Sequence, residues 1–207
     1  MFKISYNCFL FVLGILSFAA KAESILYTRE GSEIWRYDST RSEKIGVVQP
    51  GRFEMYATKG VLYTLENSEI WRYDGTIAAK VGNVPAGLFE VYPTNGVLYT
   101  RENDEIWRYD GTTALRVGYA RSNIFHVYVT CGVLYSREDS EIWRYDGTEA
   151  KKIGNVPPGN FKVFSSGGVL YTLENTELWR YDATQARKIG HVNTAPVQFL
   201  VSEVDCK

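Results

Sequence analysis

Five pairs of glutamates are the residues best suited to chemistry in this sequence. The members of each pair are three residues apart, and the pairs recur every 36 residues. They are Glu30/Glu33, Glu66/Glu69, Glu102/Glu105, Glu138/Glu141 and Glu174/Glu177. Two neighbouring carboxylates offer acceptors for a polar ligand, ligands for a cation, or partners for lysine and arginine. All three uses stay open at this point, as does simple exposure to solvent.

A tryptophan follows each pair by two residues, always in the phrase Glu-(Ile/Leu)-Trp-Arg-Tyr-Asp, and these are all five tryptophans of the chain. An indole beside a carboxylate is suited to stacking on a sugar ring, and equally to packing between sheets. Several units also have an asparagine between the two glutamates. We therefore expect a ligand to contact Glu66, Asn67, Trp71, Glu102, Asn103, Trp107, Glu138, Trp143, Glu174, Asn175 and Trp179.

The 36-residue period indicates a repeat architecture. Each unit contains four short runs rich in Val, Ile, Tyr, Phe and Trp, separated by Gly, Asn, Asp and Pro turns, which is typical of strands. No long helical periodicity is present. Four antiparallel strands per unit, repeated around an axis, predict an all-β fold: a five-bladed β-propeller of 36-residue four-stranded blades.

The two ends of the repeated region predict how this ring closes. Five periods from Glu23 end at Ser202, and residues 197–202 align with the strand at 161–166. We expect this C-terminal strand to pair with the N-terminal strands and complete the first blade. Such pairing would hide both edges of the sheet, and the propeller would comprise residues 23–207.

A two-residue turn at Asn67-Ser68 predicts which side chains share a face of the sheet. It gives three facing pairs: Glu66/Glu69, Thr64/Trp71 and Leu62/Tyr73. Opposed like charges destabilise a hairpin, so we expect compensation from Arg or Lys of an adjacent blade, from solvent, or from a ligand or cation. On the other face, Arg72 is expected to form an ion pair with Asp74 or with an acid of the next blade, and contact with a ligand is the alternative.

Residues 1–22 have the features of a signal peptide. Lys3 is followed by an apolar run at 8–18 and by Ala20-Lys21-Ala22, a small-x-small cleavage pattern. The run is shorter than the roughly 20 residues that a membrane span needs. We expect cleavage after Ala22 and a secreted or periplasmic protein with no membrane span.

The two cysteines beyond residue 22, Cys131 and Cys206, leave two alternatives open. Export permits a disulfide between them. They fall in different repeats, however, which we do not expect to be neighbours in the ring, and this favours free thiols.

Charge and motif content exclude several classes of function. Lys3 and Lys21 lie in the first 22 residues, so residues 23–207 keep 21 basic and 24 acidic side chains, a net charge of −3. No basic cluster is present, so nucleic acid is not an expected partner. His126 and His191 have no partner at metal-ligand spacing, and no nucleophile or phosphate-loop motif occurs. We expect no enzyme activity, no metal and no cofactor.

The phrase Glu-Ile-Trp-Arg-Tyr-Asp-Gly-Thr, preceded by Val-Leu-Tyr-Thr, resembles the bacterial propeller repeats named for their ELWxxDGT motif. The expected ring of five small blades is also similar in architecture to tachylectin-like lectins. The latter resemblance implies a secreted protein that binds N-acetylated sugars at several equivalent sites. No sugar-contact motif of those lectins is matched, so no binding residue is carried over.

Together these patterns predict a secreted, non-enzymatic, multivalent binding protein, with carbohydrate as its partner and equivalent sites between the blades. Five copies of a weak site gain avidity on a surface that presents repeated ligands. The alternative is a protein-interaction scaffold that binds a surface protein. Its footprint would follow the irregular residues Arg52, Arg121 and His126 rather than the repeated ones.

Overall fold

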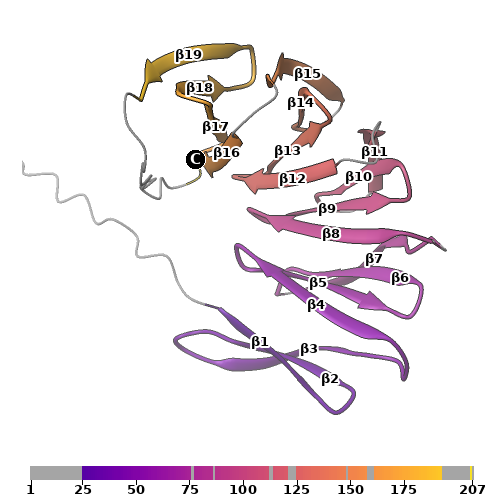
Figure 1. The fold of residues 1–207 in the computed structure, drawn as a ribbon. Helices are drawn as coiled ribbons and strands as arrows, with labels where there is room; N and C mark the ends of the chain where they lie inside the picture. Colours follow the sequence, from indigo (N-terminus) through magenta and orange to yellow (C-terminus); the bar gives the residue numbers. More distant parts are fainter. Residues whose placement is uncertain are drawn as a thin grey trace, which may run out of the picture.

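The structure is a computed structural model that describes residues 25–75, 77–85, 87–111, 114–120, 125–147, 149–157, 161–192 and 206. These residues form five antiparallel sheets, and within each sheet every strand pairs with the next one along the chain. The sheets follow one another in an arc from β1 to β19 (Figure 1). The predicted all-β repeat is confirmed as a set of repeated, propeller-like sheets.

The first sheet has three described strands: β1 (Leu26–Glu30), β2 (Glu33–Tyr37) and β3 (Ser42–Val47). The second contains β4 (Phe53–Thr58), β5 (Val61–Glu66), β6 (Glu69–Tyr73) and β7 (Ala78–Asn83). The third contains β8 (Phe89–Thr94), β9 (Val97–Glu102), β10 (Glu105–Tyr109) and β11 (Ala114–Tyr119). We call the sheets blades 1 to 5 in chain order.

The fourth blade contains β12 (Phe125–Thr130), β13 (Val133–Glu138), β14 (Glu141–Tyr145) and β15 (Ala150–Asn155). The fifth contains β16 (Phe161–Ser166), β17 (Val169–Glu174), β18 (Glu177–Tyr181) and β19 (Ala186–His191). The predicted four strands are therefore present in blades 2 to 5. The predicted fourth strand of blade 1 at 197–202, the ring closure and the signal peptide lie outside the described residues.

The apolar cores lie between neighbouring blades rather than within them. One cluster joins Ile34 and Val48 of blade 1 to Leu62 and Tyr73 of blade 2. The next cluster joins blade 2 to blade 3 in the same way, through residues that include Tyr63 and Tyr109. Blades 2, 3 and 4 thus bury both faces against neighbours, as stacked repeats do.

The strands alternate in direction, so the connections of each blade gather at two ends. We call one the tip end: it carries the hairpin turns 31–32, 67–68, 103–104, 139–140 and 175–176. The opposite, inner-turn end carries turns such as 59–60, 95–96, 131–132 and 167–168. Backbone hydrogen bonds from Asn67 to the carbonyl of Arg52 and from Val84 to that of Ser68 tie the hairpin turn to the Pro/Gly linkers. The linkers therefore share the tip end with the hairpin turns.

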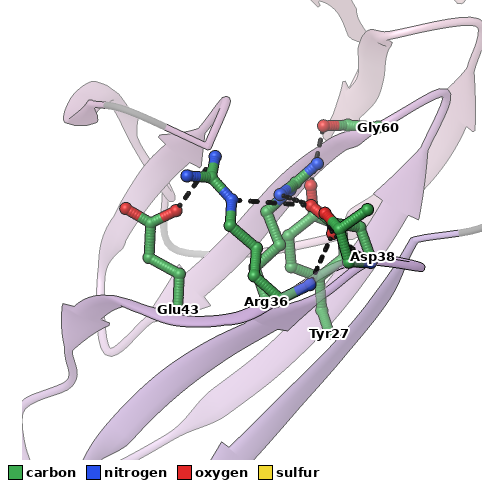
Figure 2. Close-up of polar contacts among 7 residues, drawn as sticks. Tyr27, Arg36, Asp38, Glu43 and Gly60 are labelled. Carbon is green, nitrogen blue, oxygen red and sulfur yellow. Dashed lines mark hydrogen bonds and ion pairs between the residues drawn. The ribbon is translucent and has the colours of Figure 1, made fainter.

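Polar side chains join neighbouring blades at the inner-turn end. The buried hydroxyl of Tyr63 donates to the carbonyls of Gly96 at 3.0 Å and Tyr109 at 2.9 Å. Beside it, the predicted ion pair between Arg72 and Asp74 is present at 2.7 Å. Figure 2 shows the same network in blade 1, where the Tyr27 hydroxyl donates to the Gly60 carbonyl at 2.7 Å.

A disulfide joins Cys131 to Cys206, with their Cα atoms 5.1 Å apart. The expectation that these cysteines would not be neighbours was wrong. Cys131 lies in the turn between β12 and β13, next to Gly168 of the following blade. Residue 206 lies beyond the last full period, so the spacing of the blades does not fix its position.

Candidate functional site

The strand register places the paired glutamates directly opposite each other. In blade 2, Glu66 faces Glu69, Thr64 faces Trp71 and Leu62 faces Tyr73, as the two-residue turn predicted. The same register occurs in the other four blades. In blades 2 to 5 the hairpin therefore holds two carboxylates on the face that packs against the preceding blade.

The first glutamate of each described pair in blades 2 to 5 is buried, with only 3% to 8% of its surface exposed. The Oε1 atom of Glu66 accepts two hydrogen bonds, from Thr64 Oγ1 at 2.5 Å and from the Tyr73 hydroxyl at 2.8 Å. The same bonds reach Glu102, Glu138 and Glu174. Both donors of Glu66 use one oxygen, so Oε2 accepts no hydrogen bond from the described residues.

The second glutamate is half-buried and ion-paired. Glu69 accepts the Trp71 indole N–H at 3.0 Å and the Lys80 ammonium at 2.6 Å. These bonds, led by that from Lys80, lower the pKa of the Glu69 carboxyl below its ordinary value. The cation comes from the outer strand of the same blade, which corrects the expectation of an adjacent blade. The corresponding cations are Lys44, Arg116, Lys152 and Lys188.

The tyrosine that donates to the first glutamate keeps its phenol protonated. Burial, and then the hydrogen bond to Glu66, raise the pKa of the Tyr73 phenol above its ordinary value. Tyr109 and Tyr181 have raised pKa values for the same two reasons. Their hydroxyl groups consequently stay protonated at neutral pH and keep donating to the carboxylates.

These groups meet at a pocket of about 400 Å³ between blades 1 and 2. Blade 1 contributes Gly46 and Val47 of β3, and blade 2 contributes the hairpin. The hairpin residues that line the pocket are Glu66, Asn67, Ser68, Glu69, Trp71 and Tyr73. Three of the predicted ligand contacts in blade 2 therefore lie together. We call this arrangement of a hairpin against the preceding outer strand a niche.

A glycine makes room for the tyrosine in each niche. A Cβ atom on Gly46 would lie 2.4 Å from Cε1 of Tyr73. Gly82 has the same relation to Tyr109, and Gly154 to Tyr181, both at 2.5 Å. Gly118 lies against Tyr145 in the same way. The backbone and ring contacts of the niche thus recur at all four described interfaces between consecutive blades.

The tryptophans combine packing with access to the niche. Trp71, Trp107 and Trp179 are half-buried and pack at the edge of the interblade clusters, while Trp143 is buried. Trp71 also lines the pocket. The indole of Trp71 is therefore part of the core and also part of a cavity wall.

The asparagines of the tip have a structural task that the sequence reasoning did not assign. Asn67 Oδ1 accepts the backbone N–H of Arg52 at 3.1 Å, and Asn103 Oδ1 accepts that of Leu88 at 3.0 Å. Asn67, Asn103 and Asn175 also have positive φ angles near 57°, a conformation that asparagine adopts more readily than most residues. The sequence did indicate this turn conformation, because Gly31 and Asp139 occupy the same position of the repeat. Glycine and aspartate, like asparagine, adopt positive φ angles more readily than most residues.

The described residues contain no group of three or more His, Cys, Asp and Glu side chains arranged to hold a metal ion. Nor do they contain a helix that is long and apolar enough to cross a membrane.

Comparison with known proteins does not assign the chain to a family. No protein-family model matches the chain, and no curated protein matches it. Among solved structures, the chain is similar to the N-terminal domain of Nup159, with 10% identity and a TM-score of 0.34. The match covers 78% of this chain and 61% of the Nup159 chain. A likeness of this degree says nothing about function.

Proposed function

We propose that the protein is a non-enzymatic, multivalent carbohydrate-binding protein whose binding sites are the niches between blades. The observation that carries this proposal is Glu66. It is a buried carboxylate that lines a pocket of about 400 Å³, with one oxygen satisfied by two hydroxyl groups and the other without a described donor. That second oxygen can accept a hydrogen bond from a ligand in the pocket, and hydrogen bonds to a charged group are stronger than those between neutral groups.

The other walls of the niche suit a sugar. Carbohydrate rings combine hydroxyl groups with apolar C–H faces, and binding pockets typically pair apolar walls with a few placed polar groups. In the niche, Glu66 supplies the acceptor and Trp71 the aromatic wall. A sugar hydroxyl that donates to Oε2 of Glu66 would complete the set of bonds around the carboxylate.

Charge narrows the class of sugar. The ionisable side chains that line the pocket between blades 1 and 2 are Glu66, Glu69 and Tyr73, and the phenol stays neutral because its pKa is raised. Like charges repel strongly when they are partly removed from water. We therefore propose neutral or basic sugars as ligands, and expect uronic acids, sialic acids and sulfated sugars to bind weakly.

Two features of the whole chain support an exported, multivalent protein. Blades 2 to 5 repeat the same glutamate bonds, and several weak sites gain avidity on a surface with repeated ligands. The disulfide between Cys131 and Cys206 fits an oxidising compartment. We propose cleavage of residues 1–22 and a secreted or periplasmic location.

Calorimetric titration of residues 23–207 with the methyl glycosides of glucose, galactose, mannose, glucosamine and glucuronic acid tests the proposal. We expect at least one neutral or basic glycoside to bind at more than one site per chain, and the glucuronide to bind least. The combined variant Glu66→Gln, Glu102→Gln, Glu138→Gln and Glu174→Gln should lose this binding. Glu149→Gln, an exposed carboxylate at the inner-turn end, is the control and should retain it. No binding of any glycoside by the unaltered protein would refute the proposal.

A second candidate, a scaffold that binds a surface protein, has one observation in its favour. Large apolar side chains that do not repeat are exposed near the tip end, among them Leu88 and Tyr119, at 47% and 44% exposure. A protein partner would follow such irregular residues. Leu88→Asp should then abolish capture of the partner while leaving glycoside binding unchanged.

A further inference from the structure

The two carboxylates of the blade 2 hairpin are balanced in different ways. The second, Glu69, is bound by the ammonium group of Lys80 at 2.6 Å. The hydrogen bonds that reach the first, Glu66, from the described residues come from the neutral hydroxyl groups of Thr64 and Tyr73. A hydroxyl group can satisfy a carboxylate oxygen as an acceptor, but it does not cancel the negative charge. One charge of the pair is therefore balanced by a cation and the other is not.

The walls of the pocket do not supply the missing cation. Blade 1 contributes Gly46, Val47 and Gln49, which are uncharged, and the residues that line the pocket include no lysine, arginine or histidine. The phenol of Tyr73 stays neutral, because burial, the hydrogen bond to Glu66 and the charge of that carboxylate all raise its pKa. The pocket therefore keeps one net negative charge, that of Glu66.

The position of Glu66 makes this charge effective on a ligand. The side chain lines the pocket and is only 6% exposed. Water and salt screen a charge in such a place much less than a charge on an open surface. Its Oε2 atom has no donor among the described residues, so the carboxylate can accept a hydrogen bond from a cationic group in the pocket.

The aromatic wall of the pocket also suits a cation. Trp71 lines the pocket, and its indole N–H is already used by Glu69 at 3.0 Å. The face of an indole ring attracts cations, and it also packs against apolar C–H groups. A sugar that carries a protonated amine presents both a cation and apolar C–H groups. It therefore matches the carboxylate and the indole together.

The same charge balance recurs in other blades. The first glutamates of blades 3 and 5, Glu102 and Glu174, accept hydrogen bonds from a threonine and a tyrosine hydroxyl. The second glutamates of these blades are bound by Arg116 and Lys188. These hairpins thus repeat the charge pattern of the pocket between blades 1 and 2.

We propose that the niches select sugars with a free, protonated amino group, such as glucosamine, over the corresponding neutral and N-acetylated sugars. The inference rests on the proposed carbohydrate-binding function and refines it. The ammonium group donates to Oε2 of Glu66 and supplies the cation that the hairpin lacks, while the sugar ring packs against Trp71. N-acetylation replaces the ammonium group with a neutral amide and removes the preference. This differs from the N-acetylated ligands that the resemblance to tachylectin-like lectins implies.

The first test uses three methyl glycosides that differ only at carbon 2 of the ring: the glucosaminide, the glucoside and the N-acetylglucosaminide. Calorimetric titration of residues 23–207 below the pKa of the sugar amine should show the glucosaminide binding about tenfold more tightly than the other two. This is the difference expected because hydrogen bonds between charged groups are roughly twice as strong as neutral ones. n-Butylammonium chloride carries the charge without the ring and should bind more weakly than the glucosaminide.

The pH dependence should follow the ligand. As the pH rises through the pKa of the sugar amine, the affinity for the glucosaminide should fall to that for the glucoside, whose affinity should stay constant. The protein groups with shifted pKa values at the pocket do not change over this range. The pKa of Glu69 is lowered, chiefly by Lys80, so the carboxyl stays ionised, and that of Tyr73 is raised, so the phenol stays protonated.

A charge added to the pocket gives a matched pair of variants. Ser68 is exposed and lines the pocket. Ser68→Lys should weaken the binding of the glucosaminide in this niche about tenfold and leave that of the glucoside unchanged, whereas Ser68→Gln should leave both unchanged. The indole N–H signal of Trp71, followed by NMR, reports on this niche. Far-ultraviolet circular dichroism establishes that both variants are folded.

The outcomes separate this inference from the proposed function. If the unaltered protein binds the glucoside or the N-acetylglucosaminide as tightly as the glucosaminide, the selection of an amine is overturned and the proposed function stands. Equal binding of n-butylammonium and the glucosaminide, or equal binding of the glucosaminide by the two Ser68 variants, also counts against the inference. If the unaltered protein binds no glycoside, both are overturned together.

Discussion

The two ends of each blade use similar residues for opposite purposes. At the inner-turn end, the Tyr63 hydroxyl donates to two carbonyls of the next blade, and Arg72 is bound to Asp74. At the tip end, Tyr73 donates to one oxygen of Glu66, which lines a pocket and whose other oxygen has no donor among the described residues. At the inner-turn end, polar side chains are therefore paired with backbone carbonyls and with each other. At the tip end, carboxylate oxygens remain available to accept hydrogen bonds from a ligand.

This difference separates stability from binding. Changes at the inner-turn end should lower the free energy of unfolding and leave the affinity for glycosides unchanged. Changes to the open groups of the tip end should do the reverse. The following predictions, from the largest expected effect to the smallest, test that division.

Removal of the disulfide should have the largest effect. The bond between Cys131 and Cys206 spans 75 residues, and a loop of that length corresponds to about 4 kcal/mol of stability in the chain-entropy description. Denaturant unfolding of the Cys131→Ala, Cys206→Ala double variant should show this loss. Unchanged unfolding midpoints with and without reductant would contradict it, as would a loss of glycoside affinity in the folded variant.

Gly82→Ala should come next, because it forces a methyl group against the Tyr109 ring, 2.5 Å from Cε1. Overpacking of this kind costs about 1–3 kcal/mol, and it should also displace the hydroxyl that binds Glu102. Gly111→Ala is the matched control, since no heavy atom lies within 4 Å of its added Cβ. Equal thermal midpoints for the two variants would show that the glycine is not required by the ring.

Tyr99→Phe should lower stability by about 1–3 kcal/mol without affecting binding. Its hydroxyl donates to the carbonyls of Gly132 and Tyr145 at 2.9 and 3.0 Å, and the substitution leaves a partly buried and a buried acceptor short of a donor. Tyr119→Phe, at an exposed tyrosine, serves as the control for unfolding and should be nearly neutral. Weaker glycoside binding by Tyr99→Phe would contradict the division in which the inner-turn end serves stability and the tip end serves binding.

Alkaline pH should weaken the blades through the same tyrosines. Burial raises the pKa of Tyr99 above its ordinary value of 10.0, and burial with a bond to Glu54 raises that of Tyr56 to about 12. Because the folded pKa values are the higher ones, this stability is complete below pH 10 and is lost as the pH rises through them. Thermal melts from pH 8 to 12 should show it, less steeply for Tyr99→Phe.

Lys80→Gln should have the smallest effect on stability, because the Lys80–Glu69 pair is open to solvent. The pKa of Glu69 should rise toward the ordinary 4.5, since the lysine is the main cause of its lowered value. Carboxyl titration by NMR measures this directly. The contribution of the pair is complete above pH 4.5 and is lost as the pH falls through the lowered pKa.

The sequence was sufficient for the repeat and for the hairpin register. The 36-residue period and the two-residue turn correctly placed Glu66 opposite Glu69 and Arg72 beside Asp74, because strand pairing is a local consequence of turn length. The strands are short and rich in β-branched and aromatic residues, so their number and order could be predicted.

The rest depended on contacts that the repeat pattern does not encode. Cys206 lies in a tail beyond the last period, so nothing in the spacing pointed to Cys131. The cation for Glu69 lies 11 residues further on, at Lys80, and a β-bulge between Ile70 and Trp71 shifts the register that brings it there. The role of Asn67 in holding a linker arises from packing between a hairpin and a loop.

The most direct test of the central claim is an NMR titration that follows the five tryptophan indole N–H signals as the best-binding methyl glycoside is added. The indole N–H of every tryptophan, such as that of Trp71, donates to the second glutamate of its pair. If sugars bind in the niches, those signals should shift as the glycoside is added, and the signal of Trp71, which lines the pocket, should be among them. If calorimetry detects binding while all five signals stay in place, the niches are not the binding sites.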